Sequence, residues 1–259
     1  MRVAANLALM FTDVPLLQRY EKAAKMGFKL IECPLPYSVP AEDLRREADK
    51  YGQVHVLINA PQGDTIGECG FAALPSYKDY YIETIATAIK YAKILSCPRI
   101  HIMAGTNAKN DKESHDLFVG NIRYAAEEFA KEGFECLIEP INQITRPGFY
   151  LRSLEQAEQI IEEINAPNLT ILYDTFHIQQ IHGQLTYTIK KYASKIGQIQ
   201  IAQVGKKRAE PDYEGEIDYD YVFKVLKEVN PNWIVGCEYF NQGDTLEYVE
   251  WVKKYGLEF

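Results

Sequence analysis

The sequence predicts an α/β fold, a single (β/α)₈ barrel that occupies residues 1–259. The length of 259 residues is close to the roughly 250 residues typical of one such barrel. Short apolar runs rich in β-branched residues alternate along the whole chain with segments of helical spacing, as in a parallel sheet covered by helices. No Pro/Ser-rich linker, low-complexity tract or shift in composition divides the chain, so one domain is expected.

Eight pairs of a strand and a following helix can be recognised along the chain. The expected strands are the apolar runs Val3–Leu9, Phe28–Cys33, Gln53–Ile58, Arg99–Met103, Glu135–Glu139, Leu169–Tyr173, Ile196–Ile201 and Trp233–Cys237. The clearest helical segments are Tyr77–Leu95, Ser114–Lys131, Leu154–Ile164, Tyr219–Val229 and Thr245–Tyr255. The second and fifth strands begin in similar segments, Gly27–Pro34 and Gly133–Pro140, in which the glycine is expected to end the preceding helix.

Composition and charge exclude several classes of protein. The formal net charge is −8 at pH 7, whereas a protein that binds nucleic acid needs a basic face of clustered Lys and Arg. No apolar run approaches the roughly 18 residues of a membrane helix. The first residues read as a core strand rather than a secretory signal, and the last do not match a peroxisomal address, so a cytoplasmic location is expected.

The five cysteines carry no chemistry in this interpretation. They are scattered, odd in number and free of the close pairs that a zinc site or redox motif shows. Reduced thiols are expected, and Cys33, Cys136 and Cys237 fall in or beside strands, where a cysteine is more often a small buried hydrophobe.

Oxygen-bearing side chains occur at the ends of four consecutive strands, where barrels of this kind place their catalytic groups. Glu139 ends the fifth strand, Asp174 follows the sixth, Gln200 lies in the seventh and Glu238 follows the eighth. A charge at the end of an apolar strand is expensive to bury unless it is paired or bound to a cation. Three carboxylates and an amide oxygen at one mouth suit a hard divalent ion, Mg²⁺ or Mn²⁺.

Each of these residues also has a purely structural interpretation. Asp174 precedes Thr175 and is a candidate N-cap of the next helix. A buried glutamine such as Gln200 equally satisfies backbone groups. The joint occurrence of these residues on adjacent strands nevertheless favours a shared site.

The histidines differ in their expected roles. His177, three residues beyond Asp174, lies within reach of anything bound above the sixth strand, and we assign it to substrate binding. His55 is expected to be a hydrogen-bonded core residue, whereas His101, inside the fourth strand, stays open between structure and function. The absence of a histidine at position 200 weakens a zinc assignment.

Other chemistries lack their motifs. No strand ends in a lysine, which argues against Schiff-base chemistry in the barrel mouth. The chain has no P-loop, no GxGxxG and no GxSxG, so neither nucleotide binding nor serine hydrolysis is indicated.

Over nearly its whole length the sequence resembles the hydroxypyruvate isomerase family, a branch of the xylose-isomerase-like barrels. The matching blocks are Ala4–Leu7, Gly67–Gly70, Ala72–Pro75, Ile102–Gly105, Ile138–Asn142, Tyr173–Asp174 with His177, Gln200–Ala202, Glu210–Pro211, Gly215–Ile217 and Val235–Tyr239. The resemblance implies that Glu139 and Glu238 transfer the proton, and that both hold the metal together with Asp174 and Gln200. It also implies interconversion of hydroxypyruvate and tartronate semialdehyde through an enediolate, which a metal stabilises.

Two departures from the family pattern leave the exact substrate open. Cys69 stands where the family usually has arginine, and Gln203 where it usually has aspartate. Arg208, with Lys206 or Lys207, is a candidate to supply the replacement charge for a substrate carboxylate. We assign Arg208, His101 and Glu68 to substrate binding as well.

The polar segment from Gly205 to Asp218 is expected to form a long loop over the barrel mouth. A loop of this kind is typically a lid or a binding loop that excludes water from the reaction. Glu216 is expected to anchor the closed loop or to orient a basic group, although a solvated connector is the simpler interpretation for any one of these charges.

The sequence leaves three alternatives open. The same scaffold also suits a 2-oxo-tetronate isomerase or a ketose 3-epimerase. A barrel that binds a sugar acid or a partner protein without catalysis is a second class, which the presence of both glutamates disfavours. An apurinic endonuclease would gather many histidines around several zinc ions, but this chain has five histidines in total. The expected small-molecule partner is a hydroxylated keto acid, and the oligomeric state is left open.

Overall fold

The computed structural model describes residues 1–63, 69–109, 111–243 and 246–259, and the strands of these ranges form one closed parallel barrel in chain order. The strands are β1 Arg2–Asn6, β2 Leu30–Glu32, β3 Val54–Asn59, β4 Arg99–Ile102, β5 Glu135–Ile138, β6 Leu169–Asp174, β7 Ile196–Ile201 and β8 Ile234–Cys237. Because β8 also pairs with β1, the sheet has no open edge. The predicted α/β barrel is therefore confirmed.

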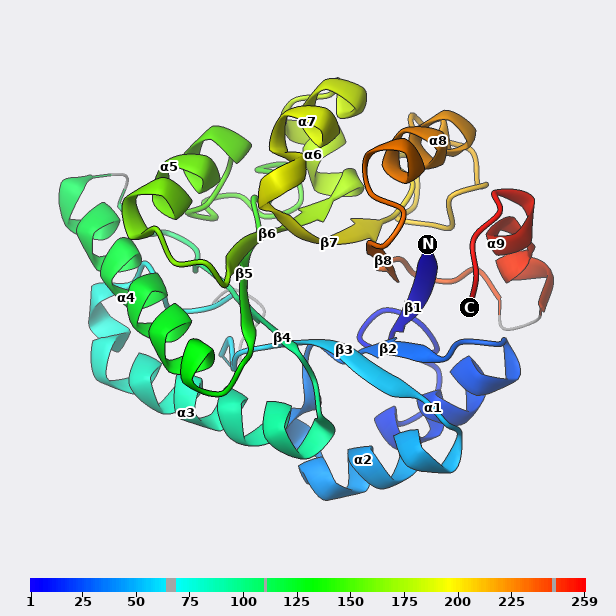
Figure 1. Ribbon diagram of the computed structural model, residues 1–259, viewed down its shortest axis with the longest axis horizontal. Helices are drawn as coiled ribbons and strands as arrows, with labels where there is room; N and C mark the ends of the chain where they lie inside the picture. The colour runs from blue at the N-terminus through cyan, green and yellow to red at the C-terminus, as the bar shows by residue number, and fades with distance from the viewer. Residues whose placement is uncertain (64–68, 110, 244–245) are drawn as a thin grey trace.

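Helices surround the barrel (Figure 1). They are α1 Leu16–Lys25, α2 Ala41–Lys50, α3 Lys78–Leu95, α4 Lys112–Lys131, α5 Leu154–Ile164, α6 Thr175–Ile181, α7 Leu185–Tyr192, α8 Tyr219–Val229 and α9 Glu250–Lys254. Their apolar faces pack against the outer side of the strands, as α4 does with Phe118, Ile122 and Phe129. Within the described ranges, no helix is both long and apolar enough to cross a membrane.

The predicted strands differ from the observed ones by at most three residues at an end. The first strand stops at Asn6 rather than at Leu9. The carbonyl oxygen of Asn6 accepts a hydrogen bond from Met10 N at 2.9 Å, and its side-chain Oδ1 accepts one from Ala8 N at 3.1 Å. These bonds turn the chain immediately after Asn6. The length of the apolar run therefore overestimates the length of the strand.

Two helical predictions also need correction. The segment after β6 contains two helices, α6 and α7, separated by Gly183 and Gln184, which both have positive φ angles. The expected final helix from Thr245 to Tyr255 is a 3₁₀ turn, Leu246–Val249, followed by α9. Thr245 itself lies outside the described residues. The expected helix ends at Gly27 and Gly133 are confirmed, since both glycines have positive φ angles.

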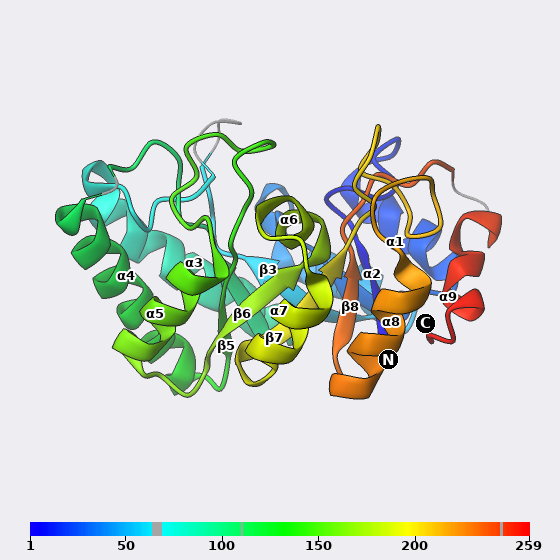
Figure 2. The ribbon, with the colours of Figure 1, turned by 90° about the horizontal axis from the view of Figure 1, so that it is seen from above.

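The barrel interior contains apolar side chains below a polar layer at the carboxyl ends of the strands, and the buried Gln198 lies level with Leu172. One apolar cluster inside consists of Leu57, Leu137 and Leu172. Side chains two residues apart on a strand point to the same face, so Glu139 and Asp174 follow Leu137 and Leu172 on the inner side. Figure 2 shows the loops that follow the strands gathered at the upper edge of the molecule, and this edge is the barrel mouth.

Candidate active site

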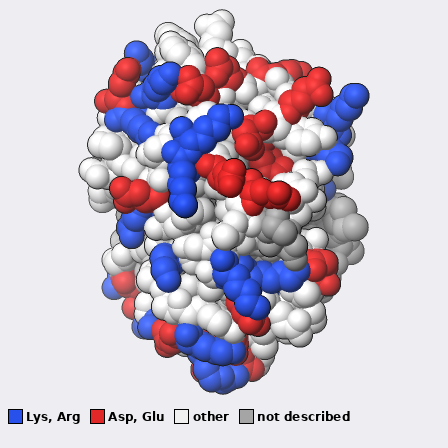
Figure 3. All heavy atoms as spheres, turned by 90° about the vertical axis from the view of Figure 1, so that its right-hand side faces the viewer, with Lys and Arg blue, Asp and Glu red and all other residues white. Residues whose placement is uncertain are grey.

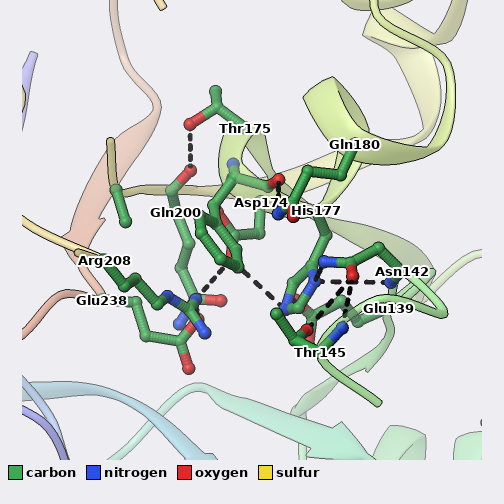
Figure 4. A network of polar contacts seen from close by, with 12 residues as sticks. Glu139, Asn142, Thr145, Asp174, Thr175, His177, Gln180, Gln200, Arg208 and Glu238 are labelled. Atoms are coloured by element: carbon green, nitrogen blue, oxygen red, sulfur yellow. Dashed lines mark hydrogen bonds and ion pairs between the residues drawn. The ribbon is translucent and has the colours of Figure 1, made fainter. Parts of the chain in front are cut away.

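Glu139, Asp174 and Glu238 come from three different strands and meet at the barrel mouth (Figure 4). Asp174 ends β6, whereas Glu139 and Glu238 directly follow β5 and β8. Asp174 is fully buried and Glu139 is 4 % exposed, while Glu238 is partly open to solvent. The structure thus brings together the three carboxylates that the sequence placed at strand ends.

Arg208 lies between two of these carboxylates. Its Nη2 donates to Oδ2 of Asp174 and to Oε2 of Glu238, each at 2.6 Å. Its guanidinium group also lies over the ring of Phe176, 4.4 Å from the centroid. Burial opposes the charge, but the surrounding carboxylates outweigh it and raise the pKa of Arg208. Arg208 therefore supplies a fixed positive charge inside the mouth.

Two histidines flank Glu139. His177 Nε2 lies 3.8 Å from Oε1 of Glu139, and His101 Nε2 lies 3.7 Å from its Oε2. Burial lowers the pKa of His101 to about 3 and that of His177 well below its usual value, so both rings are neutral. Burial, followed by the charges of Glu238 and Asp174, raises the pKa of Glu139 well above its usual range. The site therefore favours a Glu139 that holds a proton when no cation is nearby.

The hydrogen bonds of His177 identify its tautomer. Asn142 directs both its backbone N–H and its side-chain Nδ2 at Nδ1 of His177, at 3.4 and 2.7 Å. The amide orientation of Asn142 is fixed because its Oδ1 accepts from the backbone N–H groups of Ile144 and Thr145. Nδ1 is therefore an acceptor, and the proton of the neutral ring lies on Nε2. His177 Nε2 is accordingly a hydrogen-bond donor towards the carboxylates.

Asp174 caps a helix with one oxygen and contacts the mouth with the other. Its Oδ1 accepts from Phe176 N at 2.9 Å, which caps α6, while Oδ2 contacts Arg208. Burial raises the pKa of Asp174 to about 7, although the charge of Arg208 opposes the shift. The structural and functional interpretations of this residue are thus compatible, because the two oxygens have different partners.

Glu32, which the sequence interpretation did not assign, lies inside the barrel next to Gln200. It ends β2 and is fully buried, and its Oε2 accepts from Nε2 of Gln200 at 2.9 Å. Burial, and then the charge of Glu238, raise the pKa of Glu32 to about 8, against the effect of its amide donors. Glu32 ends β2, so the rule that identified the other carboxylates applies to it as well, although the predicted strand Phe28–Cys33 placed Cys33 rather than Glu32 at the strand end.

The loop between β7 and α8, residues 202–218, is held in place by the buried amide of Gln203. This amide bonds the carbonyl oxygens of Pro211, Tyr213 and Ile217 at 3.0–3.3 Å and the N–H groups of Val204 and Ile217 at 3.0 and 2.9 Å. The loop carries Arg208 into the mouth, and the carbonyl oxygen of Arg208 accepts from Phe240 N at 2.9 Å. The loop therefore contributes Arg208 to the mouth, while its residues 205–207 and 212–216 are exposed to solvent.

The other charged residues of this loop that were expected at the site do not contact the carboxylates of the mouth in the described structure. Lys206 and Glu216 are exposed, and Lys207 donates to Oε1 of Gln242 at 2.5 Å. Arg208 is the basic residue of this group that contacts the carboxylates. Glu68, which was assigned to substrate binding, lies outside the described residues.

The residues that the sequence placed in the core are found there. His55 is 1 % exposed and its Nε2 lies 2.8 Å from the hydroxyl oxygen of Tyr20. The side chains of all five cysteines are buried. At position 69 the cysteine has a left-handed backbone, with a φ angle of 44°.

The oxygen atoms of the mouth fit a divalent cation. One ligand atom each from Glu139, Asp174 and His177 lie within 4.8 Å of one another. Among the described residues, Oε1 of Glu139 and Oε1 of Gln200 are buried without a hydrogen-bond partner. Because His177 carries its proton on Nε2, the fit rests on carboxylate and amide oxygens, which hard cations prefer.

A closed parallel barrel with a cluster of charged side chains at the carboxyl ends of its strands is the usual architecture of a barrel enzyme. A family model described as "Xylose isomerase-like TIM barrel" matches residues 20–255. The chain therefore belongs to the xylose isomerase-like TIM barrel family.

Three relatives cover almost the whole chain. The hydroxypyruvate isomerase of Escherichia coli is 38 % identical over 258 residues, which cover 98 % of this chain and 99 % of that protein. The 2-oxo-tetronate isomerase of Haemophilus influenzae is 37 % identical over 257 residues, with the same coverage. A crystal structure from Brucella melitensis named AP endonuclease, family 2, is 36 % identical, covers 98 % of both chains and has a TM-score of 0.93. The resemblance to the hydroxypyruvate isomerase family is thus confirmed.

Proposed function

We propose that this chain is a cation-dependent isomerase of small hydroxylated keto acids that interconverts hydroxypyruvate and tartronate semialdehyde. The observation that carries the proposal is the meeting of Glu139, Asp174, Glu238 and Arg208 at one mouth, with buried oxygens that have no hydrogen-bond partner within the described part of the chain. The E. coli and H. influenzae relatives, named as isomerases of two such keto acids, support this substrate class.

The reaction moves a proton between two neighbouring carbons. Glu139 and Glu238 are the proton carriers, because they lie on different strands at the mouth and can face a substrate from two sides. Burial and the neighbouring carboxylates raise the pKa of Glu139, so it binds a proton more readily than an exposed glutamate does and can return it to the substrate.

Other side chains orient the substrate. The Nε2–H of His177 points towards the mouth and would donate to a substrate oxygen. The guanidinium of Arg208 would bind the substrate carboxylate, a geometry that favours two parallel hydrogen bonds. His101 Nε2, buried without a hydrogen-bond partner in the described part of the chain, would steady Glu139 or a substrate oxygen.

Glu139, Asp174, Gln200 and Glu238 would hold Mg²⁺ or Mn²⁺. Such a cation would polarise the substrate carbonyl and stabilise the negative charge of an enediolate. The side chains themselves position the substrate and transfer the proton.

A panel of C3 and C4 hydroxylated keto acids tests the proposal, each assayed with and without EDTA. We expect turnover that EDTA removes and Mg²⁺ or Mn²⁺ restores, and a loss of about 10²–10⁴-fold in Glu139→Gln and Glu238→Gln. The exposed Glu162→Gln serves as a control that keeps full activity. Turnover that resists EDTA, or near-native activity of either active-site variant, would refute the mechanism.

The same panel separates the alternatives. The two bacterial isomerases have nearly equal identity to this chain, so only kcat/KM values can separate hydroxypyruvate from a 2-oxo-tetronate. A protein that binds Mn²⁺ and a keto acid without any turnover would instead be a binding barrel.

A further inference from the structure

The buried carboxylate of Glu32 accepts amide hydrogen bonds from two other strands of the barrel. Among the described residues, Asn6 Nδ2 and Gln200 Nε2 both donate to Oε2 at 2.9 Å, and Gln198 Nε2 donates to Oε1. Asn6 ends β1, and the two glutamines lie on β7. The chain accommodates Glu32 with Gly236 on β8, since a Cβ there would overlap the carboxylate.

These contacts determine which end of the Gln200 amide faces the mouth. An amide carries its donor and its acceptor on opposite sides, so an Nε2 directed at Glu32 turns Oε1 away from it. In the described structure Oε1 of Gln200 is buried without a hydrogen-bond partner. Gln200 pairs in register with Asp174 on one side and Gly236 on the other, and Figure 4 shows it in the same cluster as Asp174 and Arg208.

We infer that Glu32 is a positioning residue that holds Gln200 with its side-chain oxygen presented to the divalent cation. The inference rests on the proposed function, because it assigns the partner that orients one of the proposed cation ligands. A glutamine is otherwise an ambiguous ligand, since a rotation of its amide by 180° replaces the oxygen with an N–H₂ group that repels a cation. Partners of metal ligands commonly influence affinity in this way.

The variant Glu32→Gln tests the inference with Mn²⁺ alone. It keeps the shape of the side chain but replaces one acceptor oxygen with a donor, so the amides around it lose a partner and Gln200 is free to reverse. We expect the affinity for Mn²⁺, measured by titration calorimetry and by electron paramagnetic resonance of free Mn²⁺, to fall by about 10–100-fold. Circular dichroism checks that the variant is folded.

Exchanging the two side chains provides the rescue. In the double variant E32Q/Q200E the new amide at position 32 donates to a carboxylate at position 200, which again offers an oxygen to the cation. We expect its Mn²⁺ affinity to return to within about threefold of wild type. A role of Glu32 in packing alone predicts no such recovery.

A matched control removes a negative charge from the other end of the barrel. Glu135 begins β5 and is bound by Arg99 and Thr170 at 2.9 and 2.8 Å, away from Gln200. Glu135→Gln is expected to bind Mn²⁺ as wild type does, which separates orientation from net charge.

The possible failures can be told apart. Unchanged Mn²⁺ affinity in Glu32→Gln, or an exchange variant that stays as weak as the single one, would overturn the role of Glu32 alone. A wild-type protein that binds no Mn²⁺ would overturn the proposed cation site and, with it, this role.

Discussion

Replacement of His55 should change how the stability of this protein depends on pH. The imidazole lies in β3, is 1 % exposed and contacts the hydroxyl of Tyr20. Burial lowers its pKa from an ordinary value of 6.5 to about 4. The folded protein therefore holds His55 neutral at pH values where the unfolded chain already binds a proton.

The sign and size of the effect follow from this difference. A lowered histidine pKa leaves full stability above pH 6.5, and stability is lost as the pH falls through 6.5 towards 4. At pH 7.5 both states are almost unprotonated at His55, so the contribution is close to zero. At pH 5 His55 is mostly protonated in the unfolded state and mostly neutral in the folded state. This difference lowers the free energy of unfolding by about 2 kcal/mol.

Urea denaturation of wild type and His55→Gln, in EDTA at pH 7.5 and pH 5, measures the effect. The difference between the unfolding free energies of wild type and variant cancels the titration of all other groups. From pH 7.5 to pH 5 this difference should shift by about 2 kcal/mol in favour of the variant. His115→Gln is the matched control, because His115 is partly exposed and contacts Glu163 at the surface. Parallel pH profiles for wild type and His55→Gln would refute the reasoning.

Further predictions concern the mouth and one helix. Arg208→Ala should raise KM for keto acids by about 10–100-fold through loss of a charged hydrogen bond, and steady-state kinetics without such a change would place carboxylate recognition elsewhere. Gly236→Ala should lower the free energy of unfolding by about 2 kcal/mol or more because its Cβ overlaps Glu32, whereas Gly120→Ala in the exposed face of α4 should raise it by about 0.5–1 kcal/mol. Denaturation curves in which Gly236→Ala is not less stable than wild type, or Gly120→Ala not more stable, would contradict these predictions. Binding of Mn²⁺ at pH 7 should release protons from groups such as Asp174, because burial raises its pKa to about 7. Calorimetry in two buffers of different ionisation enthalpy measures the number of protons released, and a value of zero would contradict the prediction.

The bounds of a helix or strand could be predicted from the sequence where residues at its own ends determine them. The predicted helix Leu154–Ile164 agrees with α5 at both ends, because Ser153 caps its start and Asn165 ends it in a left-handed conformation. The predicted Tyr219–Val229 agrees with α8, which Asp218 caps. The predicted seventh strand, Ile196–Ile201, likewise has the bounds of β7.

Contacts between distant residues could not be predicted in the same way. Placing carboxylates at strand ends followed from the barrel rule, but the bond from Gln200 to Glu32 joins residues 168 positions apart. It depends on the absence of a side chain at Gly236 on the neighbouring strand. Likewise, the sequence made Arg208 one of three basic candidates in a loop, and the loop's path around Gln203 decides that Arg208 enters the mouth.

The net negative charge of the chain is consistent with the proposed small-molecule substrate. Figure 3 shows a face on which acidic and basic side chains are interspersed, and the chain as a whole carries a formal charge of −8. An extended phosphate backbone is bound by clustered positive charge. The relative from B. melitensis therefore informs the fold of this chain, while the isomerase-named relatives support its proposed chemistry.

The position of Arg208 couples the two ligands that the proposed function requires. Oδ1 of Asp174 is used to cap α6, so Oδ2 is the oxygen left for other partners, and Arg208 Nη2 contacts it at 2.6 Å. A cation that binds Asp174 must share this oxygen with the guanidinium or displace it, because two positive charges repel each other at such distances. Displacement would free Arg208 for a substrate carboxylate while the cation neutralises the acidic cluster. In the proposed function, a cation held by Asp174 would thus leave Arg208 available to the substrate carboxylate.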